Sequence, residues 1–265
     1  KGLEVLIKDY FDNNGFPLSR NPNDLVYFLK YLIFTREIIK DAQKYVPEFL
    51  EDIIEKNLSS INFIKYPNNQ LPLFNGASEN DLSQLDKFLD GPTKKKNYEN
   101  ILGGLFKMKQ KNHLMYFDVG PPPKKKFSRC YQSGPLSFEY FLDGIKIISN
   151  SGFGNNISNK AKLLSRLTAC QSTLTLNDTS ATKFERNKLI NRIFGNSIKD
   201  SFKTYDLEIK DEKDLVGCSV SHNAYEKNFG CIHKREIYLD KENNYLRGSD
   251  YILKKKRWNP NKICF

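Results

Sequence analysis

The sequence has no hydrophobic run long enough to cross a membrane and is poor in several residue types. No stretch approaches the ~18 consecutive apolar residues of a transmembrane helix. Because such a run is absent, we expect no membrane span in these residues. Histidine occurs three times, methionine twice and tryptophan once among 265 residues.

Cysteines are also few, and their spacing excludes two common uses. The five are odd in number, scattered and never arranged as C-x-x-C, which argues against a disulfide framework or a structural zinc site. We expect free thiols that pack as small hydrophobic side chains. Because zinc-finger spacings and RNP-like aromatic motifs are absent as well, we expect no nucleic-acid partner.

What the sequence does contain is enough apolar surface for a core, together with a strong basic excess. Hydrophobic residues make up 39% and aromatic residues 13% of the chain, so wholesale disorder is excluded. The net charge of +11 favours a polyanionic partner. The alternative is a compositional bias toward lysine, asparagine and isoleucine. The basic runs lie at Lys94–Lys96, Lys124–Lys126 and Lys254–Arg257, and such runs are usually solvated loops.

Helical spacing characterises the first part of the chain. After the cap-like sequence from Asn21 to Asp24, apolar residues recur three and four apart, which predicts helix across residues 23–56. Pro47 interrupts this pattern and is expected in the first turn of a second helix. Proline and glycine breakers then predict a loop-rich linker over residues 57–100.

From residue 101 the apolar residues alternate instead, as in half-buried strands. Short polar turns such as Asp143-Gly144 separate these segments, so we predict an antiparallel β-sandwich over residues 101–265. Residues 1–100 then form a separate helical and linker part. The expected strands are Leu105–Lys109, His113–Asp118, Leu136–Leu142, Ile145–Ser149, Ser172–Leu176, Thr204–Ile209, Leu215–His222, Cys231–Leu239 and Asn244–Ile252.

Several motifs, in order, resemble the heparinase II/III-like family. Ser19-Arg20-Asn21-Pro22 and the later Leu71–Gly76 resemble the end of its toroidal helical domain and the following linker. The stretches Asp118–Pro123 and Ser133–Glu139 resemble its sandwich domain, as do Arg166–Leu174 and Ser221–Tyr225 with Ile232-His233. The resemblance covers nearly all of the chain. It implies an antiparallel sandwich preceded by the last helices of an (α/α) toroid. Because the sequence begins at Lys1 without a methionine and ends within a strand-like segment, we also expect both of its ends to be artificial.

The resemblance also implies a reaction. Enzymes of this family cleave acidic, uronate-containing polysaccharides, including glycosaminoglycans, by β-elimination. The uronate carboxylate is neutralised, a tyrosine or histidine removes the C5 proton, and a tyrosine or histidine protonates the leaving oxygen. The site lies between toroid and sandwich. Membership further implies a bacterial protein of the periplasm or cell envelope.

At three positions the sequence departs from the family's metal site. Gln132 and Gln171 stand where the family has histidine, and Asn150 stands near an aspartate of the metal-binding relatives. Because zinc prefers imidazole, thiolate and carboxylate ligands, we predict no tightly bound metal and no other cofactor. We expect the amide side chains either to form hydrogen bonds that hold the sandwich in one conformation, or to donate hydrogen bonds to a substrate carboxylate.

Candidate site residues follow from the same motifs, each with a structural alternative. Arg20 is expected to bind a substrate carboxylate or to cap the inner loop of the toroid. Tyr66 is a proton-transfer or a core tyrosine, and Glu139 orients groups in the cleft or lies on a solvated face. Tyr131 is the candidate acid or base of the sandwich, provided that a cation such as Arg129 lowers its pKa.

Two histidines form a further candidate pair. If strands 215–225 and 229–240 form a hairpin around Lys227-Asn228, His222 and His233 lie opposite each other. They would then bind a metal or a sugar, or make structural hydrogen bonds. A bulge at Gly230 would instead separate them.

The sequence is compatible with three classes of function. The leading hypothesis is a polysaccharide lyase acting on acidic glycans. The second is a carbohydrate-binding or cell-envelope protein that keeps the fold without elimination chemistry, which Gln132 and Gln171 favour. A purely structural sandwich is the third, and it predicts a large exposed apolar patch in place of a polar cleft.

Overall fold

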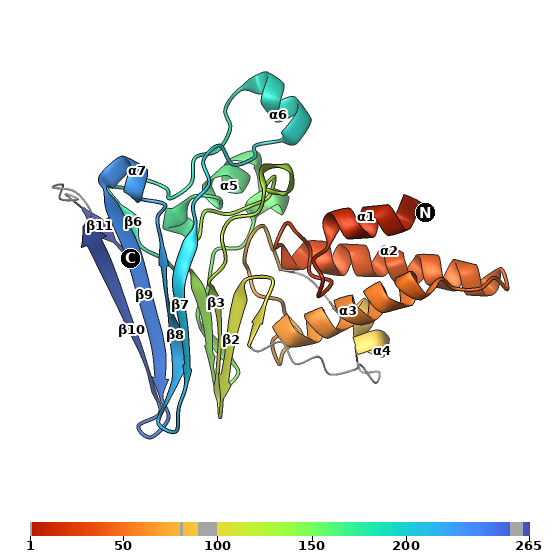
Figure 1. Cartoon of the computed structure of the whole chain (residues 1–265), viewed down its shortest axis with the longest axis horizontal. Helices are drawn as coiled ribbons and strands as arrows, with labels where there is room; N and C mark the ends of the chain where they lie inside the picture. The colour runs from red at the N-terminus through yellow and green to blue at the C-terminus, as the bar shows by residue number, and fades with distance from the viewer. Residues whose placement is uncertain (1, 80–81, 90–99, 255–261) are drawn as a thin grey trace.

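The protein consists of a helical layer packed beside two antiparallel sheets (Figure 1). The computed structural model describes residues 2–79, 82–89, 100–254 and 262–265. The predicted fold class, an antiparallel sandwich preceded by helices, is confirmed. In the described residues no helix is both long and apolar enough to span a membrane.

The helical layer contains three main helices, α1 (Gly2–Tyr10), α2 (Pro22–Asp41) and α3 (Glu48–Ile64). The side chain of Asn21 caps α2 by accepting the backbone N–H of Asn23 at 2.9 Å. Pro47 precedes α3 as its cap residue, so it lies one position outside the predicted first turn. The helix prediction for residues 23–56 ends too early, because α3 continues to Ile64, and it misses α1.

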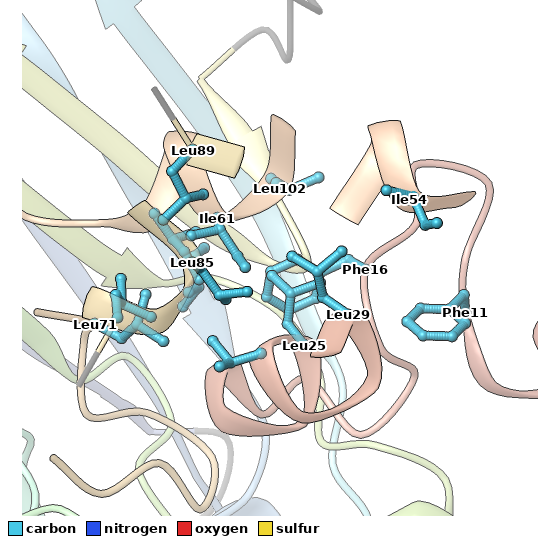
Figure 2. Packing of buried hydrophobic residues seen from close by; sticks show 14 of the residues in the cluster. Phe11, Phe16, Leu25, Leu29, Ile54, Ile61, Leu71, Leu85, Leu89 and Leu102 are labelled. Carbon is cyan, nitrogen blue, oxygen red and sulfur yellow. The ribbon is translucent and has the colours of Figure 1, made fainter. Parts of the chain in front are cut away.

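One apolar cluster joins these helices to the linker and to the first sheet (Figure 2). Phe16, Leu25 and Leu29 lie at its centre with almost no exposed surface. Leu71 of the linker packs into the cluster, and so do Leu85 and Leu89 of the short helices η1 (Ser83–Leu85) and α4 (Asp86–Leu89). Since Leu114, Tyr116 and Phe141 of the sheet belong to the cluster, helices and sandwich share a core.

The first sheet has the strand order β1-β2-β3-β4-β5, all antiparallel. Its central strand β3 is buried on both faces: Leu114 and Tyr116 face the helical cluster, whereas Met115 and Phe117 face the second sheet. The strands are β1 (Ile101–Leu102), β2 (Leu105–Gln110), β3 (His113–Asp118), β4 (Phe138–Leu142) and β5 (Ile145–Ile148).

The second sheet has the order β10-β9-β8-β7, and Val216, Val220 and Ile237 fill the space between the sheets. Its strands are β7 (Thr204–Asp211), β8 (Leu215–His222), β9 (Cys231–Asp240) and β10 (Tyr245–Lys254). A small ribbon pairs β6 (Thr175–Leu176) with β11 (Ile263–Cys264).

The short helices in the connections between strands were not predicted. They are α5 (Asn159–Leu164), α6 (Lys188–Phe194), α7 (Glu226–Phe229) and the 3₁₀ turns η2 (Lys125–Phe127), η3 (Gly154–Asn156) and η4 (Thr168–Cys170). Asn187 caps α6 by accepting the backbone N–H of Leu189 at 2.9 Å, and Ser158 caps α5 in the same way. The predicted strand Ser172–Leu176 is shorter than expected, since only β6 is extended and paired.

Candidate functional site

A buried ion pair fastens the loop before α2 to the first sheet. The Arg20 guanidinium pairs with Asp118 and donates to the carbonyls of Gly103 at 2.9 Å and Pro121 at 2.7 Å. Burial raises the pKa of Asp118, and the neighbouring Arg20 opposes that rise. Of the two roles predicted for Arg20, the geometry favours the structural one, because its donors all point into the protein.

Glycines make room for this guanidinium. A Cβ added to Gly104 would lie 2.5 Å from the Arg20 side chain, and one added to Gly120 would lie 2.7 Å from it. Gly104 also has a positive φ of 77°. The glycine in the Asp118–Pro123 motif is thus explained by the close approach of Arg20.

Glu139 is a second buried anchor between helical part and sandwich. Its Oε2 accepts the Tyr66 hydroxyl at 2.7 Å and the backbone N–H of Leu73 at 3.2 Å. Its Oε1 accepts the backbone N–H of Asn150 at 3.0 Å, and Lys146 Nζ lies 3.6 Å from the carboxylate. Because Glu139 has no exposed surface, the predicted solvated face is wrong.

Tyr66 belongs to the core. Its ring stacks on Phe141 with the centroids 3.9 Å apart, and only 1% of its surface is exposed. Burial raises the pKa of Tyr66 well above its ordinary value, and the Glu139 carboxylate adds to the rise. Both facts favour the core alternative over proton transfer.

The amides at the expected metal positions come together in one hydrogen-bonded cluster. Nε2 of Gln132 and Nε2 of Gln171 both donate to the Ser165 carbonyl, at 2.9 and 2.8 Å. Gln132 Nε2 also donates to the Gly152 carbonyl, and its Oε1 accepts the backbone N–H of Gly76 at 3.0 Å. Both donor hydrogens of Gln132 are therefore taken, and it has none to offer a substrate.

Asn150 lies beside this cluster with one open donor. Its Oδ1 accepts the backbone N–H of Ser172 at 3.0 Å, but its buried Nδ2 has no hydrogen-bond partner. A zinc ion would find amides here and none of the ligands that it prefers, so the residues do not fit the family's metal. Within the described ranges, no three His, Cys, Asp or Glu side chains are grouped to hold a metal.

Tyr131 does not have the environment that a base requires. Only 1% of its surface is exposed, burial raises its pKa, and Asp118 raises it further. Arg129 is exposed and packs against Gly195, and the cations that oppose the rise are Arg20 and Arg166. The predicted lowering of the Tyr131 pKa by Arg129 is thus wrong.

His222 and His233 lie directly opposite each other on β8 and β9, as predicted. The backbone N–H of Ala224 donates to His222 Nδ1 at 3.1 Å, so this nitrogen carries no proton. His222 Nε2 therefore donates to His233 Nδ1 at 3.0 Å, and His233 Nε2 donates to Asp250 at 2.5 Å. Every ring nitrogen is occupied, which favours the structural alternative. The alternative of a bulge at Gly230 is wrong, because Gly230 ends α7 and the pairing of β8 with β9 has no register shift.

Arg235 links this histidine chain to the amide cluster. It binds Asp250 through two nitrogens at 2.7 and 2.9 Å and donates to the carbonyls of Leu136 and Ser172. Burial would raise the pKa of Asp250, but the hydrogen bonds from His233 and Arg235 outweigh it and lower the pKa to about 2. Burial lowers the pKa of both histidines.

Several charged residues act on Cys130, where linker, α2 and sandwich loops meet, and of these the sequence singled out only Arg129. The Cys130 backbone lies against Gly76 of the linker. Burial raises the pKa of its thiol, the Asp24 carboxylate raises it further, and Arg166, Lys162 and Arg129 oppose the rise. We call Arg129 and Lys162 the basic rim; Arg129 was a candidate from the sequence, whereas Lys162 was not.

Asp24 places a carboxyl at the same junction. It accepts the Ser19 hydroxyl at 2.6 Å and Asn21 Nδ2 at 3.3 Å. Burial raises its pKa above the ordinary value despite the Ser19 hydrogen bond. The sequence showed Asp24 only as part of a helix cap.

Comparisons with known proteins identify a family and similar solved structures for this fold. The sequence model of the family described as Heparinase II/III-like, C-terminal, matches residues 101–259. Heparan sulfate lyase HepC from Pedobacter heparinus is similar in structure, with a TM-score of 0.68 and 17% identity over 94% of this chain and 40% of that chain. Heparinase III is similar with a TM-score of 0.65 and 13% identity, over 95% of this chain and 42% of that one.

A heparinase III described as the BT4657 gene product gives a TM-score of 0.71 at 15% identity, over 94% of this chain and 40% of that chain. These identities show a shared fold. The chain spans about two fifths of the length of these solved enzymes. No curated protein matches the sequence.

Proposed function

Because the chain belongs to the heparinase II/III-like family, we propose that it forms the sandwich side of a polysaccharide lyase acting on uronate-containing glycans. The observation that carries the proposal is the basic rim, a set of cations at the junction of helices and sandwich. Its charge suits an acidic polysaccharide. The structurally similar proteins named heparan sulfate lyase and heparinase III support the same substrate class.

In this proposal the rim neutralises the substrate carboxylate. A uronate C5 proton becomes removable only when the adjacent carboxylate is neutralised by positive charge or hydrogen bonds. Arg129 is exposed and offers a planar fork that matches a carboxylate, and Lys162 lies beside the same Cys130. Burial raises the pKa of Asp24 above its ordinary value, and we assign it as the candidate acid or base of this chain.

In this proposal most of the residues singled out from the sequence hold the parts of the site in place and do not contact the substrate. Arg20, Tyr66 and Glu139 hold the helical part against the first sheet. Gln132, Asn150 and Gln171 fix the loops behind Cys130, while His222 and His233 fix the second sheet. Tyr131 stays a prediction as a proton-transfer residue. Tyr131→Phe in the full-length protein tests it, since loss of an acid or base costs ~10²–10⁴ in rate.

The decisive assay mixes the full-length protein with a panel of uronate polysaccharides and follows the ultraviolet absorbance of an unsaturated product. The proposal predicts absorbance with at least one of them. It also predicts that Asp24→Asn lowers turnover by ~10² or more, whereas Asp9→Asn, on the exposed side of α1, leaves it unchanged. Turnover that survives in Asp24→Asn would remove Asp24 from the mechanism.

The second candidate function is glycan binding without cleavage. The saturated hydrogen bonds of Gln132 favour it, because they leave this amide no donor for a substrate at a position where the family has histidine. Binding to a uronate polysaccharide without any unsaturated product would support this alternative. For either function we propose the periplasm or cell envelope as the compartment and an acidic polysaccharide as the partner.

We also propose that α1–α3 are the edge of a larger helical toroid. α2 exposes an apolar stripe of residues three to four apart, namely Tyr27, Tyr31, Phe34 and Ile38, each more than half exposed. Such a stripe usually packs against another helix. The coverage of only two fifths of the similar enzymes supports the same proposal.

A further inference from the structure

Arg166 is a buried arginine that acts on Cys130 together with both cations of the basic rim. Only 2% of its surface is exposed, and within the part of the chain that the structure describes it forms no ion pair with a carboxylate. Burial lowers its pKa to about 10, so the side chain stays charged at neutral pH. Its guanidinium carbon lies 4.0 Å from the centroid of the Phe184 ring. Because a buried charge is costly unless hydrogen bonds compensate it, the acceptors of Arg166 show what it holds.

The side chain of Arg166 holds the loop that carries Arg129. Its Nε donates to the Tyr131 carbonyl at 2.8 Å, and its Nη2 donates to the Ser128 carbonyl at 3.0 Å. These two carbonyls stand on either side of Arg129 and Cys130 in the sequence. A planar guanidinium bridges two such acceptors in one fixed orientation, which an ammonium on a flexible stem does not. The backbone around Arg129 is therefore held at both ends by one side chain.

The backbone of Arg166 connects this loop to the other cation of the rim. Lys162 lies in the last turn of α5, four residues before Arg166. The backbone N–H of Arg166 donates to the Leu163 carbonyl at 3.3 Å, which continues the turn at the end of α5. The carbonyl of Arg166 accepts the backbone N–H of Ser133 at 2.9 Å. A single residue thus joins the helix that carries Lys162 to the loop that carries Arg129.

We propose that Arg166 is the positioning residue of the basic rim and sets the separation between the side chains of Arg129 and Lys162. The inference rests on the proposed function, in which these two cations neutralise the substrate carboxylate. They accelerate proton removal only if both stand where negative charge develops in the transition state. A displacement of ~1 Å can cost ~10²-fold in rate. Arg166 is buried and acts through the two exposed or half-buried cations, without touching the glycan.

The test is a double-mutant cycle in the full-length protein with heparan sulfate as the substrate. Arg166→Gln is expected to lower kcat ~10²-fold and to change KM by less than ~3-fold, because the cations remain but are misplaced. In the rim variant, Arg129→Ala/Lys162→Ala, the same change should lower the remaining rate by less than ~3-fold, since no cations are left to place.

Two further variants separate positioning from loss of stability. Arg166→Lys keeps the charge and loses the bridge between the two carbonyls, so it should lower kcat ~10-fold, again only where the rim is intact. It carries the test if Arg166→Gln does not fold. Val220→Ala, in the core between the sheets, destabilises the protein far from the rim and should keep the wild-type kcat per folded molecule.

The outcomes distinguish this inference from the lyase proposal. If the Arg166 variants lower the rate by the same factor with and without the rim cations, the positioning role is overturned and the lyase stands. If no uronate polysaccharide gives an unsaturated product, the same cycle is measured as affinity, by electrophoresis through gels that contain heparan sulfate. Losses of affinity that occur only with the rim intact would then support Arg166 as the positioning residue and overturn the lyase. Equal losses in both backgrounds would overturn the two proposals together.

Discussion

At the scale of single residues, the buried ion pair of Arg20 and Asp118 makes the sharpest prediction. Arg20→Ala leaves a buried carboxylate without its cation, which costs ~3–5 kcal/mol of unfolding free energy. Arg20→Lys should recover only part of this, because one ammonium cannot reach all the acceptors of a guanidinium. Urea unfolding measures both variants against Arg192→Ala, for which a change within ~0.5 kcal/mol is expected. Equal stability of Arg20→Ala and the control would show that the pair does not fasten the junction.

The amide cluster leads to a prediction about metal. Neutral amides at positions 132, 150 and 171 are poor zinc ligands, so the purified protein should hold less than stoichiometric zinc. Elemental analysis of the protein after dialysis checks this. About one zinc per chain, lost in Gln132→Ala, would contradict it. Zinc that is lost instead in His222→Ala would place a metal at the histidine pair.

At the scale of elements, the histidine chain between β8 and β9 makes stability depend on pH. Burial lowers the pKa of His222 and of His233 in the folded protein, so the unfolded chain binds more protons as the pH falls. Stability is therefore fully present above the unfolded pKa of ~6.5 and is lost below it, by ~1.4 kcal/mol per pH unit for each histidine. Urea unfolding between pH 5 and 8 measures the slope. The variant His222→Gln/His233→Gln should flatten it, and an unchanged slope would assign the pH dependence to other groups.

The regular elements were predictable because each one carries its own periodic signal. The strands β2, β3, β8 and β9 agree with the alternation within one or two residues, and the pairing of His222 with His233 followed from the hairpin. The helices α5 and α6 were missed because they have only six and seven residues and no buried face among the residues described.

The candidate site was harder to predict than the elements. Family motifs identified Gln132, Gln171 and Asn150, and the structure does place them in one cluster. Their roles depend on backbone carbonyls, such as that of Ser165, that no motif marks. Asp24 was missed because Cys130, on which its charge acts, lies more than a hundred positions away in the sequence.

At the scale of the whole molecule, the stripe on α2 tests the proposal of a larger helical domain. If other helices cover the stripe, Phe34→Ala in the full-length protein removes a buried ring and costs ~3–5 kcal/mol. In the 265-residue chain alone the ring is 63% exposed, so the same change should cost little. Ile157→Ala, at an 81% exposed residue, serves as control in both proteins. If Phe34→Ala costs similarly little unfolding free energy in both proteins, no helix covers the stripe. That result would favour a purely structural sandwich with an exposed apolar patch.

Binding of an acidic glycan by the basic rim is central to the proposed function. The most direct measurement is the initial rate of unsaturated product formation from heparan sulfate by the full-length protein and by its Arg129→Ala/Lys162→Ala variant. We expect product with the wild type and a rate at least ~10²-fold lower with the variant, since two cations that neutralise the carboxylate are lost. The Arg186→Ala/Lys203→Ala variant, which removes two exposed cations elsewhere, should keep the wild-type rate. Equal rates in all three proteins would contradict the assignment of the rim, and the absence of product from every uronate polysaccharide would contradict the lyase itself.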